Sequence, residues 1–413
     1  MKSFSSKKIN PQFLKIISIL CASLVPLLVS GPFLPDLIVS SLSIWFLYYT
    51  LKNKIYYIYK NIYFYFFVSF CLVGILSSLL SDNIFFSLKG SLFYFRIGIF
   101  ALLIFHLIDQ NKKILDYFYY AFIITFSSLV VDGYFQYLTG FNLFGYPLQG
   151  VRVSSFFGNE LILGSYLARL FPLLFALFVV RSNKHPLEVY VISILFLLID
   201  ILIFLAGERA SFVLLNLSTI FIILFVLNYK WLRAGIFIIS LCVITFLTLT
   251  NERLHDRYIA SPIESIGINQ KDKNFFTPEH DSLIRTAWNM FLDKPLLGHG
   301  PRMFRIKCSD IKYKTGQNYC DVHPHNFYVQ LLAETGIIGF MFLAGLFLYF
   351  IYISLKHFFY YLFKKRKWFS DYQICLLSGL LITIWPITSN GNFYTNYLML
   401  IYSLQIGFFK KNL

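Results

Sequence analysis

The run His323-Pro324-His325-Asn326, directly before an apolar stretch, has the most distinctive chemistry in the sequence. Asn326 suits the N-cap of a helix beginning there, because its side-chain oxygen can accept hydrogen bonds from the first unpaired backbone N–H groups. His325 would then lie at the positive end of the helix dipole, which favours a neutral imidazole able to act as a base. An interfacial histidine beside a packing face is the other interpretation.

Small residues follow His325 at helical spacing. Gly336 lies eleven positions further on, and Gly339 fourteen. In a regular helix turning about 100° per residue, Gly336 falls within about 20° of the His325 face and Gly339 about 40° to its other side. Glu334 is expected on the opposite face. Glycines below the histidine would let another helix or a lipid chain approach closely.

Arginines at the edges of apolar stretches are candidates for binding an anion. Arg209 begins such a stretch, where an unpaired guanidinium would be costly. Its partner is either the neighbouring Glu208 or a phosphate group, which the planar guanidinium can bind through two parallel hydrogen bonds. Further candidates for the same anion site lie in hydrophilic connections: Arg152, Arg285 and Arg302.

Other charged residues fall within apolar stretches. Arg169 and Asp200 lie at similar depth in consecutive antiparallel spans, and each would be costly in hydrocarbon unless paired. The sequence therefore predicts a structural ion pair between them. Lys89 and Arg96, near the end of another span, either extend to the interface or join the anion site.

Two of the six cysteines lie in a hydrophilic segment. Cys308 and Cys320 are twelve residues apart, so they could form a disulfide in an oxidising periplasm. A metal site with His323 or His325 is the alternative, but the spacing lacks a CxxC pattern, and no metal is expected. The other cysteines are interpreted as small apolar side chains within spans: Cys21, Cys71, Cys242 and Cys375.

The elements that position these residues are expected to be membrane helices. The chain has 413 residues, 57% of them apolar, with a mean hydropathy of +0.65, more hydrophobic surface than a soluble core could bury. We predict an all-α integral membrane protein, a single domain over 1–413 of about twelve spans, with a hydrophilic loop at 251–326 between the ninth and tenth. The predicted spans are 13–30, 33–51, 62–80, 88–108, 114–132, 161–180, 187–206, 210–228, 233–250, 327–355, 372–388 and 394–409.

The formal charge of +16 is interpreted as a topology signal rather than a sign of nucleic-acid binding. More than half of the 36 Lys and Arg residues lie in alternate connections between predicted spans. By the positive-inside rule, both termini are cytoplasmic and the long loop is periplasmic. The first helix is expected to be retained rather than cleaved as a signal.

Three polar clusters share the periplasmic side in this topology: the connection at 133–160, the turn at 207–209 and the long loop. This placement is typical of a site at the outer leaflet of a bacterial inner membrane. An exporter would instead place polar residues along a pathway at mid-membrane, often with paired broken helices in two inverted repeats. The sequence shows no such repeats.

The histidine segment resembles a pattern of the O-antigen ligase and polymerase superfamily of bacterial envelope glycosyltransferases. His325-Asn326, nine further residues and Gly336-Ile337-Ile338-Gly339 are similar to the ligase pattern of His, a small amide or hydroxyl residue, nine positions and two spaced glycines. The resemblance is strongest over 200–345, and the twelve-span layout is similar throughout.

Two further segments support the resemblance. The stretch 281–301, with Trp288 and the run Pro-Leu-Leu-Gly-His-Gly-Pro, looks like the start of the family's periplasmic loop. Arg209 stands where the family keeps an arginine before a span. One departure is Val213, where the family often has leucine.

The resemblance implies a GT-C-like enzyme that moves a glycan from undecaprenyl diphosphate to a sugar of the lipid A core, without metal, cofactor or nucleotide sugar. His325 would act on the acceptor hydroxyl as a base or orienting group, while Arg209 and Arg285 would neutralise the leaving diphosphate. Substrate-binding roles fall to Arg152, Arg302 and Asn326. Inversion at the anomeric carbon is expected.

Other functions remain open. A repeat-unit polymerase would use the same donor with a carrier-linked glycan as acceptor, and a protein O-oligosaccharyltransferase would use a protein. A lipid or glycan exporter is the alternative from a different class. The expected partners are the undecaprenyl diphosphate-linked glycan, the lipid A core and membrane lipids.

Overall fold

The computed structural model describes residues 9–181, 185–266, 277–364 and 367–409. The regular secondary structure of the described part of the chain is helical, apart from two isolated β-bridges between residues 141 and 152. The predicted all-α class is therefore confirmed.

Nine helical stretches in the described residues are long and apolar enough to cross a membrane, as expected of a multi-pass membrane protein. They are α1 with α2 (Pro11–Ala22, Leu24–Ser30), α3 (Phe33–Lys52), α4 (Ile62–Leu79), α5 with α6 (Ile84–Ser91, Phe95–Gln110), α7 (Lys113–Thr139), α8 (Leu163–Val180), α9 (Pro186–Leu205), α11 (Lys230–Thr250) and α16 (Phe327–Lys364).

Three shorter apolar helices occupy the remaining predicted spans. They are α10 (Arg209–Phe225), α17 (Asp371–Thr383) and α18 (Asn396–Phe408). Each predicted span thus coincides with a helix, and the crossing of all twelve stays a prediction.

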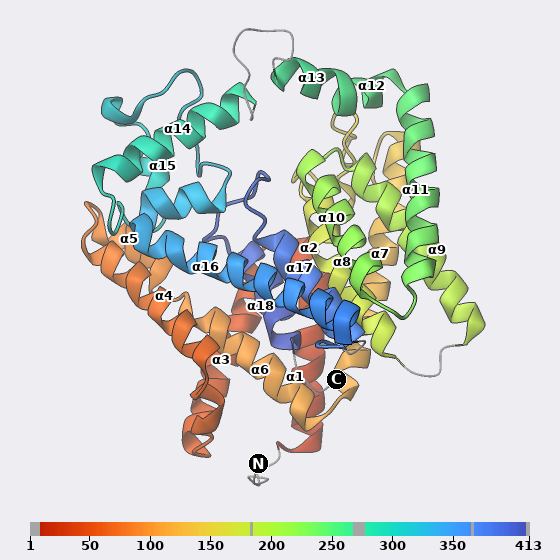
Figure 1. Cartoon of the computed structure of the whole chain (residues 1–413), viewed down its shortest axis with the longest axis horizontal. Coiled ribbons are helices and arrows are strands. Elements are labelled where there is room, and N and C mark those ends of the chain that lie inside the picture. Colours follow the sequence, from red (N-terminus) through yellow and green to blue (C-terminus); the bar gives the residue numbers. More distant parts are fainter. Residues whose placement is uncertain (1–8, 182–184, 267–276, 365–366, 410–413) are drawn as a thin grey trace.

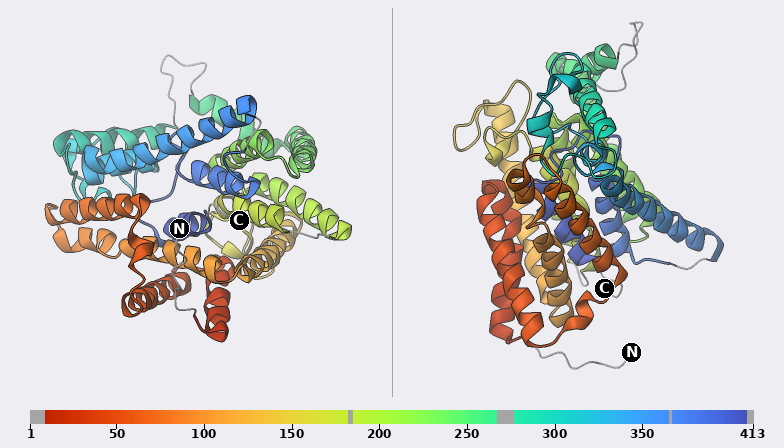
Figure 2. Two further views of the ribbon diagram at one scale, coloured as in Figure 1. Left: turned by 60° about the horizontal axis from the view of Figure 1, so that its bottom comes forward. Right: turned by 90° about the vertical axis from the view of Figure 1, so that its left-hand side faces the viewer.

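The centre of the molecule is formed by α8, α17 and α18. Figure 1 shows α17 and α18 between α3–α6 on one side and α7–α11 on the other, and α8 packs directly against α17. Every residue of α17 is buried. Helix α16 runs obliquely across the others (Figure 2) and contacts both α4 and α17.

The hydrophilic segment folds into short helices at one end of the molecule. They are α12 (Glu252–His255), the π-helical turn η3 (Asp256–Ala260), α13 (Ser261–Ile266), α14 (Pro278–Asp293), α15 (Phe304–Lys307) and the 3-10 turn η4 (Ile311–Tyr313). Helix α1 begins at the opposite end (Figure 1).

Helix α16 is broken at Gly336, where φ is 65° and ψ is −167°. The regular-helix geometry expected to carry the His325 face down to Gly336 and Gly339 is therefore wrong beyond this point. A left-handed φ favours glycine, and a Cβ at Gly336 would collide with the backbone of Leu296. The break is thus also a point of close backbone contact.

The glycine-containing run 295–300 supplies hydrogen-bond partners for the backbone groups around the break in α16. His299 donates its N–H to the carbonyl of Ala333 at 3.0 Å, and Gly300 donates to that of Glu334 at 2.8 Å. Beyond the break, the N–H of Ile337 donates to the carbonyl of Pro295 at 2.8 Å. We call these backbone contacts between 295–300 and 333–337 the α16 joint.

The predicted ion pair between Arg169 and Asp200 is wrong, because Asp200 pairs with Arg233. Two hydrogen bonds, of 2.6 Å and 3.0 Å, join the guanidinium to the carboxylate, and both side chains are buried. Helix α10 has only 17 residues, so the chain turns back early and α11 begins beside the middle of α9. Arg233, the first residue of the predicted span 233–250, therefore lies inside the helical core.

Arg96 neither extends to the interface nor joins the anion site. Its Nη2 lies 2.5 Å from the Asp36 carboxylate on α3 and donates to Asn396 Oδ1 at 3.0 Å. These contacts tie α6 to α3 and α18. Lys89 is exposed on α5.

Cys308 and Cys320 form a disulfide in the structure, with their Cα atoms 5.1 Å apart. The other four cysteines are free. The bond closes a ring over 308–320, which includes η4, and Cys308 at the end of α15 is completely buried.

Arg233→Ala should destabilise the protein by about 3–5 kcal/mol, because it leaves the Asp200 carboxylate buried without its partner. Thermal unfolding of the detergent-solubilised protein measures the change. Lys294→Ala is the control, since Lys294 forms a partly exposed ion pair with Asp82 and its loss should cost about 1 kcal/mol or less. Equal effects of the two changes would contradict the importance of the buried pair.

The disulfide predicts how many thiols react with a maleimide after denaturation. Protein purified without reductant should label at four cysteines, and at all six after reduction, as counted by intact-mass spectrometry. In Cys308→Ala, five thiols should react with or without reductant. Six labels in the unreduced wild-type protein would show that the bond does not form.

Candidate functional site

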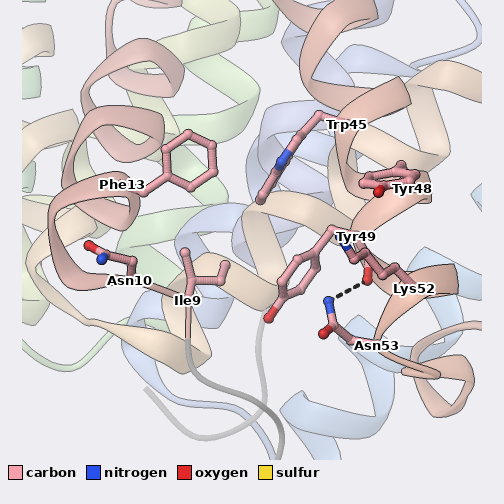
Figure 3. A pocket seen from close by; sticks show the side chains of 8 residues that line it. All are labelled: Ile9, Asn10, Phe13, Trp45, Tyr48, Tyr49, Lys52 and Asn53. Carbon is pink, nitrogen blue, oxygen red and sulfur yellow. Dashed lines mark hydrogen bonds between the residues drawn. The ribbon is translucent and has the colours of Figure 1, made fainter.

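Two apolar or aromatic pockets lie away from the charged clusters. Figure 3 shows one of about 350 Å³ where α1 meets the end of α3, lined by the rings of Phe13, Trp45 and Tyr49 with Lys52 at its edge. Another, of about 260 Å³, is an apolar groove between α10, α16 and α17. Neither is lined by a histidine or a carboxylate, and we therefore examine the charged clusters beside the hydrophilic segment.

Asn326 is the N-cap of α16. Its Oδ1 accepts the backbone N–H groups of Tyr328 at 3.0 Å and Val329 at 3.2 Å. Its Nδ2 donates to the carbonyl of Pro386 at 2.7 Å, which holds the start of the helix against the segment after α17. His325, with φ of 55°, is thereby fixed directly before the helix.

His325 packs in a group of three imidazoles, which we call the histidine cluster. Its ring centroid lies 4.1 Å from that of His323 and 5.1 Å from that of His280 on α14. Burial lowers the pKa of His323 to about 4, and burial with the charge of His325 lowers the pKa of His280. Both neighbours of His325 are therefore neutral at pH 7.

The histidine cluster is not arranged as a metal centre. No group of three or more His, Cys, Asp or Glu side chains in the part of the chain that the structure describes is placed to hold an ion. Imidazole can serve here as a base or a hydrogen-bonding group.

Glu208 does not neutralise Arg209. Its carboxylate accepts the backbone N–H groups of Gly164 at 2.8 Å and Ser165 at 3.1 Å, and the hydroxyl of Ser211 at 2.9 Å. These contacts cap the start of α8, where a negative charge is favourable. Arg209 instead donates to Ser261 at 3.0 Å.

Arg257 on η3 is a residue that the sequence reasoning missed. Its Nη2 and Nε donate to the carbonyl of Gly207 at 2.7 Å and 3.1 Å. Its charge acts on both Arg209 and Arg152. Only the π-helical turn directs Arg257 toward Gly207, and the spacing of residues in the sequence gave no signal for such a turn.

Arg152 approaches the same turn from the 133–160 connection. Its Nε donates to the carbonyl of Ala206 at 3.3 Å. Burial, and then the charge of Arg257, lower the pKa of Arg152. Arg152, Arg209 and Arg257 thus converge around residues 206–208, and we call them the arginine cluster.

Asn390 connects the two clusters. Its backbone N–H donates to the carbonyl of His325 at 2.8 Å, and its Oδ1 accepts from Arg169 Nη2, also at 2.8 Å. Arg169 is buried in α8 and feels the charge of Glu208, which caps that helix. Asn390 thus links His325 to Arg169 by hydrogen bonds, and Arg169 interacts electrostatically with Glu208 beside the arginine cluster.

The structure places Arg285 and Arg302 elsewhere. Arg285 lies on α14, is largely exposed and pairs with Asp281 at 2.6 Å. The guanidinium of Arg302 lies 5.4 Å from the ring centroid of Phe86 on α5. In the described part of the chain, no contact joins either to the arginine cluster, although α14 also carries His280.

The arrangement combines a fixed imidazole with a concentration of positive charge. Such a pair of features suits proton removal from one reactant and charge neutralisation on another.

The comparisons with known proteins bear on this site. The comparison with curated proteins gives no match. The family model described as O-antigen ligase matches residues 192–344, which include Arg209, Arg257, Arg285 and His325. This match over residues 192–344 supports the O-antigen ligase superfamily.

Proposed function

We propose that this protein is an O-antigen ligase, which moves a glycan from undecaprenyl diphosphate to the lipid A core at the periplasmic face of the inner membrane. The observation that carries the proposal is an arginine cluster and a histidine fixed at a helix start, with Asn390 and Arg169 between them. The match to the O-antigen ligase family model supports a glycosyltransferase-like enzyme that acts on a lipid-linked glycan.

The arginine cluster supports binding of a diphosphate. Three guanidinium groups converge on one turn, and the nearest carboxylate, Glu208, is already occupied by N–H and hydroxyl donors. The positive charge left over favours an anionic ligand. Each guanidinium can bind two oxygens of a phosphate, which suits a leaving group with two adjacent phosphates.

The histidine cluster supports activation of an acceptor hydroxyl. In the proposed step, the hydroxyl oxygen bonds to the anomeric carbon as the bond from that carbon to the diphosphate oxygen breaks. The hydroxyl proton passes to His325, and the bonding electrons leave with the diphosphate, which Arg209 and Arg257 neutralise. A single direct displacement inverts the anomeric carbon, and this scheme uses no metal.

The remaining candidates take binding roles in this scheme. Arg285 and His280 share α14, so Arg285 is proposed to meet the donor diphosphate from the histidine side. Arg152 adds to the arginine cluster, Asn326 orients His325, and Arg302 binds glycan at the edge of the site.

The disulfide supports the proposed orientation. Cys308 and Cys320 belong to the same hydrophilic segment as the histidine cluster, and disulfides persist in the periplasm rather than in the cytosol. We propose that this segment is periplasmic and that both termini are cytoplasmic.

A reconstituted assay tests the function. Purified protein in liposomes would receive a diphosphate-linked glycan donor and either lipid A core or a second donor molecule as acceptor. Transfer to the core is expected, and His325→Ala should lower kcat by about 10²- to 10⁴-fold because the base is lost. Chain growth on the carrier would instead identify a polymerase, and a fully active His325→Ala would refute the assignment of the base.

Arg257→Ala tests the arginine cluster. The variant loses charge-assisted hydrogen bonds to the donor diphosphate, which contribute about 1.5–3 kcal/mol to binding the transition state. We therefore expect kcat/KM for the donor to fall by about 10- to 100-fold. The matched control is Arg253→Ala, because Arg253 is exposed one helical turn away on α12, and its kcat/KM should stay within about twofold of wild type. Equal losses in both variants would indicate a general charge effect instead.

A further inference from the structure

The carboxylate of Asp321 holds the imidazole of His325. Asp321 Oδ2 lies 3.2 Å from His325 Nε2, while Oδ1 accepts the backbone N–H of Val322 at 2.5 Å. Both carboxylate oxygens are thus engaged, which fixes the direction in which the carboxylate faces the ring. An aspartate that accepts from one ring nitrogen determines which nitrogen carries the proton.

The hydrogen bond to Asp321 leaves Nδ1 of His325 to act as the acceptor. With the proton on Nε2, Nδ1 carries a lone pair, and no described residue forms a hydrogen bond with it. The rings of His323 and His280 pack against His325 and restrict its rotation. Arg305 on α15 is a further charged group of this region and acts on His323.

The disulfide anchors Asp321, which directly follows Cys320. The ring over 308–320 is fastened to α14 at two points: Tyr313 donates to the Asp293 carboxylate at 2.6 Å, and Thr315 Oγ1 donates to the carbonyl of Ser282 at 2.7 Å. Tyr313 is buried. The half-exposed Asp321 therefore directly follows Cys320, whose position the disulfide fixes.

We propose that Asp321 is the positioning residue that keeps Nδ1 of His325 directed at the acceptor hydroxyl, and that the Cys308–Cys320 bond holds Asp321 in place. This inference rests on the proposed function. In the transfer step, the proton of the acceptor hydroxyl moves to Nδ1, Nε2 keeps its proton, and Asp321 stabilises the resulting imidazolium without becoming protonated.

Replacement of the carboxylate tests the positioning role. Asp321→Asn should lower kcat by about 10- to 100-fold with an unchanged KM for the donor, a smaller effect than the about 10⁴-fold of a buried triad because Asp321 is half-exposed. Asp321→Glu should recover part of the activity. Asp310→Asn is the matched control, since Asp310 lies in the same ring, is similarly exposed and forms its ion pair with Lys307, away from His325.

A second measurement does not depend on glycosyl transfer. Diethyl pyrocarbonate modifies neutral imidazole, and peptide mass spectrometry can follow its rate at His325 as a function of pH. Removal of the negative charge in Asp321→Asn disfavours the imidazolium, so the acid limb of the rate profile should move to lower pH. Asp310→Asn should leave the profile in place.

The disulfide is tested by its coupling to Asp321. The double variant Cys308→Ala/Cys320→Ala should lose kcat in the wild-type background but lose little more when combined with Asp321→Asn, because both changes remove one interaction. Full additivity would show that the bond acts on stability alone and would overturn that half of the inference.

The outcomes separate this inference from the proposed function. If His325→Ala abolishes transfer while Asp321→Asn keeps its kcat and its modification profile, Asp321 has no positioning role although the function stands. If wild-type protein transfers nothing to lipid A core, the proposed function fails. The modification profile of His325 still tests the contact with Asp321, because it should shift in Asp321→Asn only if that contact exists.

Discussion

The α16 joint is the contact on which the candidate site depends. Non-helical backbone close to a membrane needs partners within the protein, because lipid offers none. Here the run 295–300 supplies them, so that the break at Gly336 leaves carbonyl and N–H groups paired. The short first part of α16, with Asn326 and His325 at its start, is thereby fixed to the hydrophilic segment rather than only to the long apolar helix behind it.

Some of the charged residues form ion pairs that hold helices together, and others remain available to bind a ligand. Arg233 and Arg96 are each matched by a carboxylate, and these pairs connect helices. The arginine cluster differs, because its nearest carboxylate serves α8. This contrast between matched and unmatched charge, more than the number of arginines, distinguishes a ligand site from a structural network.

Much of the architecture could be predicted from the sequence, because the length of an apolar stretch and the residue before it are local properties. The helices coincide with the predicted spans, and Asn326 caps α16. Asp200 pairs with Arg233 instead of Arg169 because the short α10 shifts α11 along α9. A local sequence pattern does not indicate such a shift. Arg257 and the break at Gly336 likewise depend on contacts between distant segments.

The length of α16 has a mechanical consequence. After the break at Gly336, its last 28 residues, 337–364, would extend about 42 Å if straight, well beyond the hydrocarbon thickness of about 30 Å. Near the start of this unbroken part, Phe342 packs against Phe66 of α4, and near its end Phe358 packs against Phe225 of α10. A single oblique rod thus braces the half of the protein that contains α4 against the half that carries Arg209, and its rigidity, rather than the loops, sets how far apart the two halves stand.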